Sequence, residues 1–112
     1  MERRRFTRYA GDGLMVMLGG KLLPAADVSL GGVRLTDPGT VERGAVIRVR
    51  VIPHQGEVVL LGQAVEVEGR VLATGPAGLR LAFLRTGYSL AKLVVRHARR
   101  QSLDGLFMPS GR

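Results

Sequence analysis

The sequence has no cysteine and no tryptophan, and aromatic residues of all kinds make up only 4% of it. Without cysteine the chain can form neither disulfides nor thiolate metal sites, so nothing in it points to an oxidising compartment and we expect a cytoplasmic protein. Two isolated histidines, His54 and His97, make a poor metal site, so no metal is expected. The scarcity of aromatic rings argues against nucleic acid as a partner, because bases stack on such rings.

The sequence also lacks any long apolar run. No stretch approaches the roughly 18 uncharged apolar residues that a transmembrane helix requires, and no apolar segment follows the basic start MERRRFTRY. We therefore expect neither a membrane span nor an export signal. At 112 residues the chain is expected to form one domain around one core. Because 46% of the residues are hydrophobic and 16 are glycine, the core should be aliphatic and the strands short.

Acidic residues are few, since nine Asp and Glu stand against 17 Lys and Arg. Residues 1–10 hold four arginines and one glutamate, residues 85–112 hold six cations and one aspartate, and residues 11–84 hold seven charges of each sign. The cationic excess therefore lies at the two ends of the chain, where it suits an anionic partner. For the carboxyl-terminal end we prefer a simpler explanation, a basic helix that keeps a small protein soluble.

Six segments have the pattern of short β-strands. Arg48 and Arg50 alternate with apolar neighbours, as glutamates do in segment 58–69, so these two strands are expected to pair arginine against glutamate. Pro24 disfavours a central strand before position 25, which places the start of the second strand near Ala26. The expected strands are 14–18, one from about residue 26, 45–53, 58–69, 70–74 and 79–84. We expect this set to close into a six-stranded antiparallel barrel.

After Ser89 the periodicity becomes that of a helix. Residues suited to a core recur at i, i+3, i+4, i+7 and i+8, and these are Leu90, Leu93, Val94, His97 and Ala98. The expected organisation is then one domain made of a flexible arginine-rich arm at 1–12, a β-barrel at 13–85, an amphipathic helix at 86–102 and an irregular tail at 103–112.

Two short motifs stand out against this background. The first is Arg-x-x-x-Arg, formed by Arg4 and Arg8, and the second is Asp-x-Ser-x-x-Gly, formed by Asp27, Ser29 and Gly32. In their order and spacing they resemble the PilZ family, the bacterial receptor domain for cyclic di-GMP. The resemblance covers essentially the whole chain, and it implies a mostly β fold in which a split barrel carries a carboxyl-terminal helix.

The resemblance also implies a ligand site. The family motif selects Arg4 and Arg8 for contacts to guanine and phosphate, which suits them because a guanidinium fork matches phosphate oxygens and the O6 and N7 atoms of guanine. A carboxylate at Asp27 can accept from guanine N1 and N2, and the Ser29 hydroxyl can serve a phosphate, a base or the loop itself. Which arginine takes which group stays open.

Three further residues complete the expected site. The second motif ends in Gly31 and Gly32, and a missing Cβ at Gly32 either lets the ligand lie close to the strand or lets the chain bulge. Arg3 extends the first motif to a form that in this family is compatible with a stacked ligand dimer. An arginine there can stack on an outer guanine.

The resulting hypothesis is a cyclic di-GMP receptor in which the ligand orders the arm on the barrel and so signals to a partner or effector. It includes no catalysis, because no base is placed beside Ser29, and no cofactor. Two alternatives stay open: a small basic barrel that binds nucleic acid, and a PilZ-like interaction domain that binds no nucleotide. The effector, a homodimer and the ligand stoichiometry are also left open.

Overall fold

The computed structural model describes residues 6–37 and 40–107. The strands in this part of the chain are β1 (Tyr9–Ala10), β2 (Leu14–Leu18), β3 (Lys21–Val28), β4 (Gly32–Leu35), β5 (Val46–Gln55), β6 (Val58–Val59), β7 (Val65–Gly75) and β8 (Gly78–Phe83). They are joined by one short 3-10 helix, η1 (Leu61–Gln63), and followed by one α-helix, α1 (Tyr88–Phe107).

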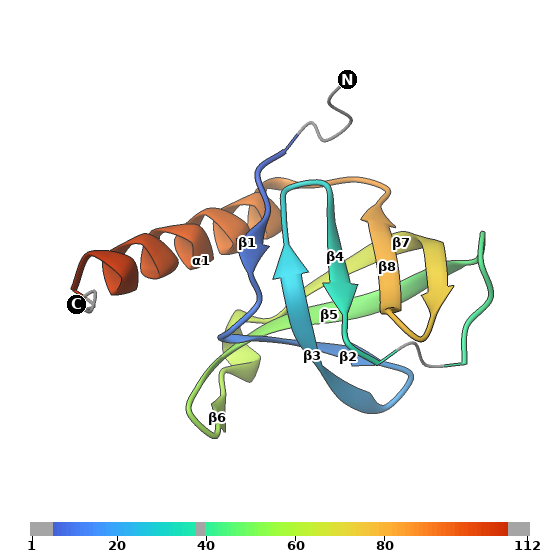
Figure 1. The fold of residues 1–112 in the computed structure, drawn as a ribbon, viewed down its shortest axis with the longest axis horizontal. Coiled ribbons are helices and arrows are strands. Elements are labelled where there is room, and N and C mark those ends of the chain that lie inside the picture. Colours follow the sequence, from blue (N-terminus) through green and yellow to red (C-terminus); the bar gives the residue numbers. More distant parts are fainter. Residues whose placement is uncertain (1–5, 38–39, 108–112) are drawn as a thin grey trace.

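Six of these strands form a closed antiparallel barrel (Figure 1). The order is β3, β2, β5, β7, β8 and β4, and β4 then pairs with β3 to complete the ring. The two short strands lie outside this ring, where β1 pairs with β3 and β6 pairs with the end of β5. The expected six-stranded barrel with a carboxyl-terminal helix is thus confirmed.

The charge ladder on β5 and β7 forms as expected. Arg48 lies opposite Glu68 and Arg50 opposite Glu66 in the strand register. Arg48 reaches both acids, with its Nη2 3.2 Å from Glu68 Oε2 and its Nε 3.7 Å from Glu66 Oε2. All three side chains of these ion pairs are at least half exposed, so the pairs favour the register while adding only a few tenths of a kcal/mol.

The strands are divided differently from the expectation. The expected strands 58–69 and 70–74 are largely one strand, β7. The segment that contains the second motif was expected to be one strand, but it forms a hairpin of two strands, β3 and β4. The start near Ala26 is also wrong, because β3 begins at Lys21 and includes Pro24. Pro24 pairs with Met15 of β2 on one side, while β4 extends only as far as the residue opposite Ala25 on the other. A residue without an N–H is tolerated where a strand has one neighbour.

Part of the arm predicted at residues 1–12 forms a strand. Tyr9 and Ala10 pair with the end of β3, as an extension of the edge that β2 occupies further along. Gly11 follows β1 in the connection to β2, and a Cβ there would lie 2.1 Å from the Ala25 carbonyl oxygen. The close backbone approach that this glycine permits lets the chain run along β3 first as β1 and then as β2.

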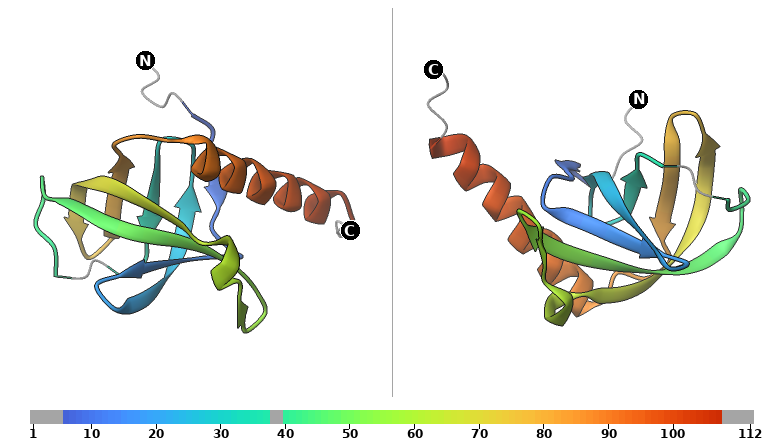
Figure 2. Two further views of the ribbon diagram at one scale, coloured as in Figure 1. Left: turned by 180° about the vertical axis from the view of Figure 1, so that it is seen from behind. Right: turned by 90° about the horizontal axis from the view of Figure 1, so that it is seen from below.

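Helix α1 covers one end of the barrel. Leu90, Leu93 and Val94 are buried in the common core, and His97 Nε2 donates to the carbonyl oxygen of Ala10 at 2.6 Å. The helix continues to Phe107, past the predicted end at 102, and its last turns project beyond the barrel (Figure 2). The sequence between residues 88 and 107 contains no proline that would interrupt the helix. In the described part of the chain, no helix is long and apolar enough to cross a membrane.

The core is aliphatic apart from one phenylalanine, and it joins residues of six strands to the helix. Its buried members are Leu14, Val16, Leu23, Ala25, Val28, Val33, Leu35, Val49, Val51, Val67, Val71, Leu79, Leu81, Phe83, Leu90, Leu93 and Val94. The prediction of an interior with few aromatic rings is therefore confirmed.

Gly32 lies where the backbone of β4 closely approaches that of its neighbour β8. A Cβ built on Gly32 would lie 2.3 Å from the carbonyl oxygen of Leu81, which is backbone and cannot move aside. A Cβ on the adjacent Gly31 would instead meet the ring of Phe6 at 2.8 Å, and that side chain is 44% exposed. The two glycines of the motif therefore differ, because only Gly32 is required for the sheet to close.

We accordingly expect Gly32→Ala to lower the free energy of unfolding by about 1–3 kcal/mol, the cost of forcing a methyl group into packed backbone. Gly31→Ala is the matched control and should cost less than about 1 kcal/mol, because the exposed Phe6 ring can rotate away. Urea denaturation of both variants measures the difference. Equal losses for the two would contradict this account of Gly32.

Candidate functional site

The carboxylate of Asp27 lies on the outside of the barrel, where β1, β3 and β4 run side by side. In the strand register Asp27 is opposite Ala10 on one side and Arg34 on the other. Arg34 Nε donates to Asp27 Oδ2 at 2.8 Å. This contact follows from the hairpin itself, because directly opposed residues of an antiparallel pair place their side chains on the same face.

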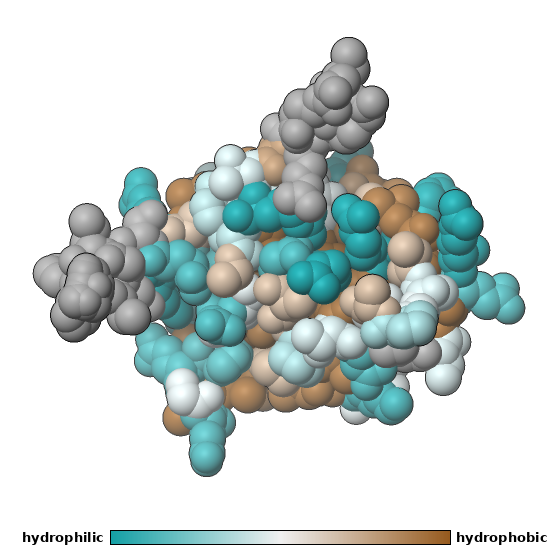
Figure 3. All heavy atoms as spheres, in the orientation of Figure 1, coloured by the Kyte–Doolittle hydropathy of each residue, from teal (hydrophilic) through white to brown (hydrophobic). Residues whose placement is uncertain are grey.

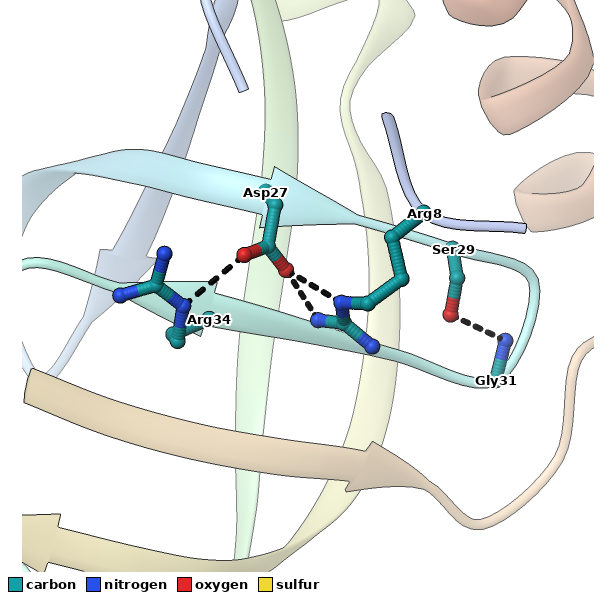
Figure 4. Close-up of polar contacts among 5 residues, drawn as sticks. All are labelled: Arg8, Asp27, Ser29, Gly31 and Arg34. Carbon is teal, nitrogen blue, oxygen red and sulfur yellow. Dashed lines mark hydrogen bonds and ion pairs between the residues drawn. The ribbon is translucent and has the colours of Figure 1, made fainter. Parts of the chain in front are cut away.

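A second arginine reaches the same carboxylate from the arm. Arg8 immediately precedes β1, so the pairing of β1 with β3 brings its side chain over Asp27 (Figure 4). Its Nε donates to Asp27 Oδ1 at 2.6 Å, and its Nη2 contacts the same oxygen. The side chains of Arg8 and Asp27 are only 16% and 19% exposed. Each oxygen of the carboxylate is thus held by a different arginine from a different segment.

The two arginines change the acidity of Asp27. Partial burial raises the pKa of this carboxyl group, but the hydrogen bonds and positive charges of Arg8 and Arg34 outweigh that effect and leave the pKa below its ordinary value of 3.8. Asp27 is therefore a carboxylate throughout the physiological pH range. It can accept hydrogen bonds but has no proton to donate.

Ser29, Gly31 and Gly32 form the turn that follows Asp27. The Ser29 N–H donates to the carbonyl oxygen of Gly32 at 2.8 Å, and the Ser29 hydroxyl accepts from the Gly31 N–H at 3.1 Å. The Ser29 side chain is buried, at 3% exposure. This hydroxyl was expected to bind a phosphate, a base or the loop, and the structure shows it bonded to the backbone of the loop.

The role of Gly32 also differs from the expected one, which was to make room for a ligand or to let the chain bulge. The space that it leaves is occupied by the backbone of β8, as described above, and not by an opening for a ligand. Gly31 is the glycine on the accessible side, next to the ring of Phe6. Residues 6 to 8 of the arm therefore lie over this turn and over Asp27.

Arg34 and Arg80 were not among the residues expected at the site. Arg80 on β8 lies directly opposite Arg34 in the strand register and is exposed. Arg8 and Arg34 bind the carboxylate, and Arg80 lies one strand further along the same face, so three arginines and one aspartate leave this patch an excess of two positive charges. Figure 3 shows the hydrophilic groups that gather over β3, β4 and β8 in this view. Outward-facing positions on two strands carry arginine, but the sequence does not reveal that the strands are adjacent.

Of the seven residues expected to form the site, five lie in the described part of the chain. These are Arg8, Asp27, Ser29, Gly31 and Gly32, and the structure brings them together around the β3–β4 turn. Arg3 and Arg4 lie outside the described residues, so their expected contacts stay a prediction.

Comparison with family models and with curated proteins gives no match. Several solved structures are similar in fold, among them the three that follow. An uncharacterized protein of Legionella, Lpg0364, has a TM-score of 0.64 at 13% identity over 88% of this chain and 98% of its own. The PilZ domain of YcgR from Escherichia coli, solved with c-di-GMP, has a TM-score of 0.61 at 15% identity over 93% of this chain and 95% of its own.

The third is the motility inhibitor MotI/DgrA of Bacillus subtilis, with a TM-score of 0.61 at 16% identity over 93% of this chain. Only 53% of that protein is matched, so this chain corresponds to about half of it. At these identities the likeness concerns the fold, and the chain has a PilZ-like fold as the two motifs predicted.

Because the pKa of Asp27 is lower in the folded protein than in the unfolded chain, its ion pairs stabilise the fold fully above about pH 4 and lose this effect as the pH falls through the folded pKa. We expect Asp27→Asn to lower the free energy of unfolding by about 1–3 kcal/mol at neutral pH, since two charged donors lose their acceptor. Urea denaturation between neutral and acidic pH should show the difference from wild type vanishing below the pKa.

Glu68→Gln serves as the control for this prediction, because it breaks an ion pair whose two side chains are at least 50% exposed. Its effect at neutral pH should stay under about 0.5 kcal/mol. If Asp27→Asn were as mild as this control, the cluster would have no structural role.

Proposed function

We propose that this chain is a receptor module for cyclic di-GMP, and that the ligand binds on the outer face of the barrel over β3 and β4. The observation that carries the proposal is the convergence of Arg8 and Arg34 on the Asp27 carboxylate, beside the turn that contains Ser29. Its support from other proteins is a PilZ domain of the same fold that was solved with c-di-GMP.

The charge of the cluster suits such a ligand. Cyclic di-GMP carries two phosphodiester charges, and the patch formed by Asp27, Arg8, Arg34 and the neighbouring Arg80 has an excess of two positive charges. Guanidinium groups match both phosphate oxygens and the O6 and N7 edge of guanine bidentately. The ligand therefore meets complementary charge and complementary donors on one patch.

Binding proceeds by exchange of partners within this cluster. Asp27 accepts from guanine N1 and N2, which requires Arg8 to give up one or both of its present contacts to Oδ1. The freed guanidinium then bonds to a phosphate or to the Hoogsteen edge of a guanine. Arg34 keeps its contact to Oδ2 and holds the carboxylate in place. Because both arginines are already gathered on the surface, little ordering entropy is lost at residues 8 and 34.

The arm transmits the signal. Residues 6–8 lie against the barrel, with the Phe6 ring beside Gly31 and Arg8 on Asp27. Arg3 and Arg4, which the family motif assigns to the ligand, add contacts to it, and the surface that the arm and the ligand form together is read by an effector protein. The module has no catalytic role, since the Ser29 hydroxyl is committed to the turn.

Isothermal titration calorimetry of cyclic di-GMP tests the proposal. Wild type should bind in the micromolar range or tighter, and Arg8→Ala and Asp27→Ala should each weaken binding at least about tenfold, because each removes a charge-assisted contact. Arg34→Ala should weaken it by a smaller factor, since it acts partly through Asp27. Circular dichroism establishes that the variants are folded.

Arg50→Ala is the matched control, because it removes the same charge from an exposed position of β5 outside the cluster. Its affinity should equal that of wild type. A folded wild-type protein that gives no heat at about 100 μM ligand would contradict the proposal and favour an interaction domain that binds no nucleotide. Equal or tighter binding of a single-stranded oligonucleotide of the same charge would favour the nucleic-acid barrel instead.

A further inference from the structure

A groove of about 540 Å³ lies between helix α1 and the barrel, separate from the Asp27 cluster. One wall is the helix, and the other is formed by the end of β5, the residues around η1 and the start of β7. The barrel side is lined by Pro53, Gly62, Gln63, Ala64, Val65 and Glu66. None of the residues that form the Asp27 cluster lines it, so the groove is a separate surface.

The helix wall of the groove is a ridge of cations. Tyr88, Lys92, Arg96 and Arg100 recur every fourth residue, so they lie along one face of the helix, and all four line the groove. Lys92 Nζ is 5.8 Å from the centroid of the Tyr88 ring. Among the residues whose side chains the structure describes, no carboxylate forms an ion pair with Lys92, Arg96 or Arg100.

The groove also offers apolar surface at its floor and rim. Leu93 and Val65 line its inner part, while the ring of Tyr88 at the first turn of the helix is 80% exposed. Leu61, adjacent to the groove-lining Gly62 on η1, is 62% exposed. An exposed tyrosine beside arginines is typical of protein-binding surfaces, because both residue types are enriched there.

We propose that this groove docks an extended, acidic segment of a partner protein. Successive cations on the ridge are four helical residues apart, a rise of about 6 Å. Acidic residues at alternate positions of an extended chain are about 6.6 Å apart, so their carboxylates match the ridge, while the residues between them face the apolar floor or solvent. The positive charge of the ridge therefore selects an acidic segment, and the spacing of its cations selects an extended conformation.

The chain's own ends do not supply this occupant. Residues 108–112 contain no acid and residues 1–5 contain one glutamate among three arginines. A nucleic acid fits less well, because its bases would need exposed rings to stack on, and of the two rings in the lining Tyr88 is exposed while His97 is buried. The proposal stands whether or not the chain binds cyclic di-GMP, because no residue of the Asp27 cluster takes part.

The test uses the full chain and a short fluorescent peptide in which glutamate alternates with threonine or leucine. Fluorescence anisotropy should show binding in the micromolar range that weakens with added salt. Arg96→Glu should weaken it at least about tenfold, because the charge reversal falls in the middle of the ridge. Arg99→Glu is the matched control, since Arg99 is an exposed arginine of the same helix that does not line the groove, and it should change the affinity less than about threefold.

Several results would overturn the proposal. Equal weakening by the two reversals would mean that only the net charge attracts the peptide. A peptide with glutamine in place of glutamate that binds as tightly would exclude recognition of acids. An oligonucleotide that binds tighter than the peptide and is lost with Arg96→Glu would assign the groove to nucleic acid, and a dimer seen by light scattering that Arg96→Glu dissociates would assign it to a second copy of the chain.

Discussion

One partly buried carboxylate organises the surface on which the proposed function depends. Asp27 receives Arg8 from the arm on one oxygen and Arg34 from β4 on the other. A carboxylate at this depth without cations would be costly, and two arginines this close without an anion would repel each other. The cluster is therefore stable only as a whole, and it leaves positive charge in excess. This excess of positive charge can neutralise a doubly anionic ligand.

The barrel supplies the geometry that the cluster needs. Gly11 lets the arm continue as β1 along the edge of β3, which brings Arg8 to Asp27, and Gly32 lets β4 approach β8, which brings Arg34 opposite Arg80. Helix α1 holds the same region from the other side, since His97 donates to Ala10 only two residues from Arg8. The helix also forms one wall of the second groove. Helix α1 therefore contacts or lines both proposed binding surfaces, although the two surfaces have no lining residue in common.

Much of this could be predicted from local patterns. Alternation in β5 and β7 and the change of period at α1 specified a barrel with a terminal helix, and the two motifs specified five of the residues that now surround one turn. Strand boundaries were harder, because Ser29 and the two glycines resemble a strand interior until the Ser29 hydroxyl is seen to close a turn. Arg34 and Arg80 could not be found, since their proximity depends on which strands are neighbours. The groove beside α1 depends in the same way on packing of distant segments.

The central claim is that Arg8 and Arg34 are held by Asp27 in the free protein and meet the ligand together. The side-chain Nε–Hε resonances of the arginines, followed by NMR as cyclic di-GMP is added, test it most directly. In the free protein the Nε–Hε protons of Arg8 and Arg34 should exchange more slowly than that of Arg50, and both resonances should shift on titration while that of Arg50 does not. Fast exchange at Arg8 and Arg34 in the free protein, or a ligand that shifts neither resonance, would contradict the account.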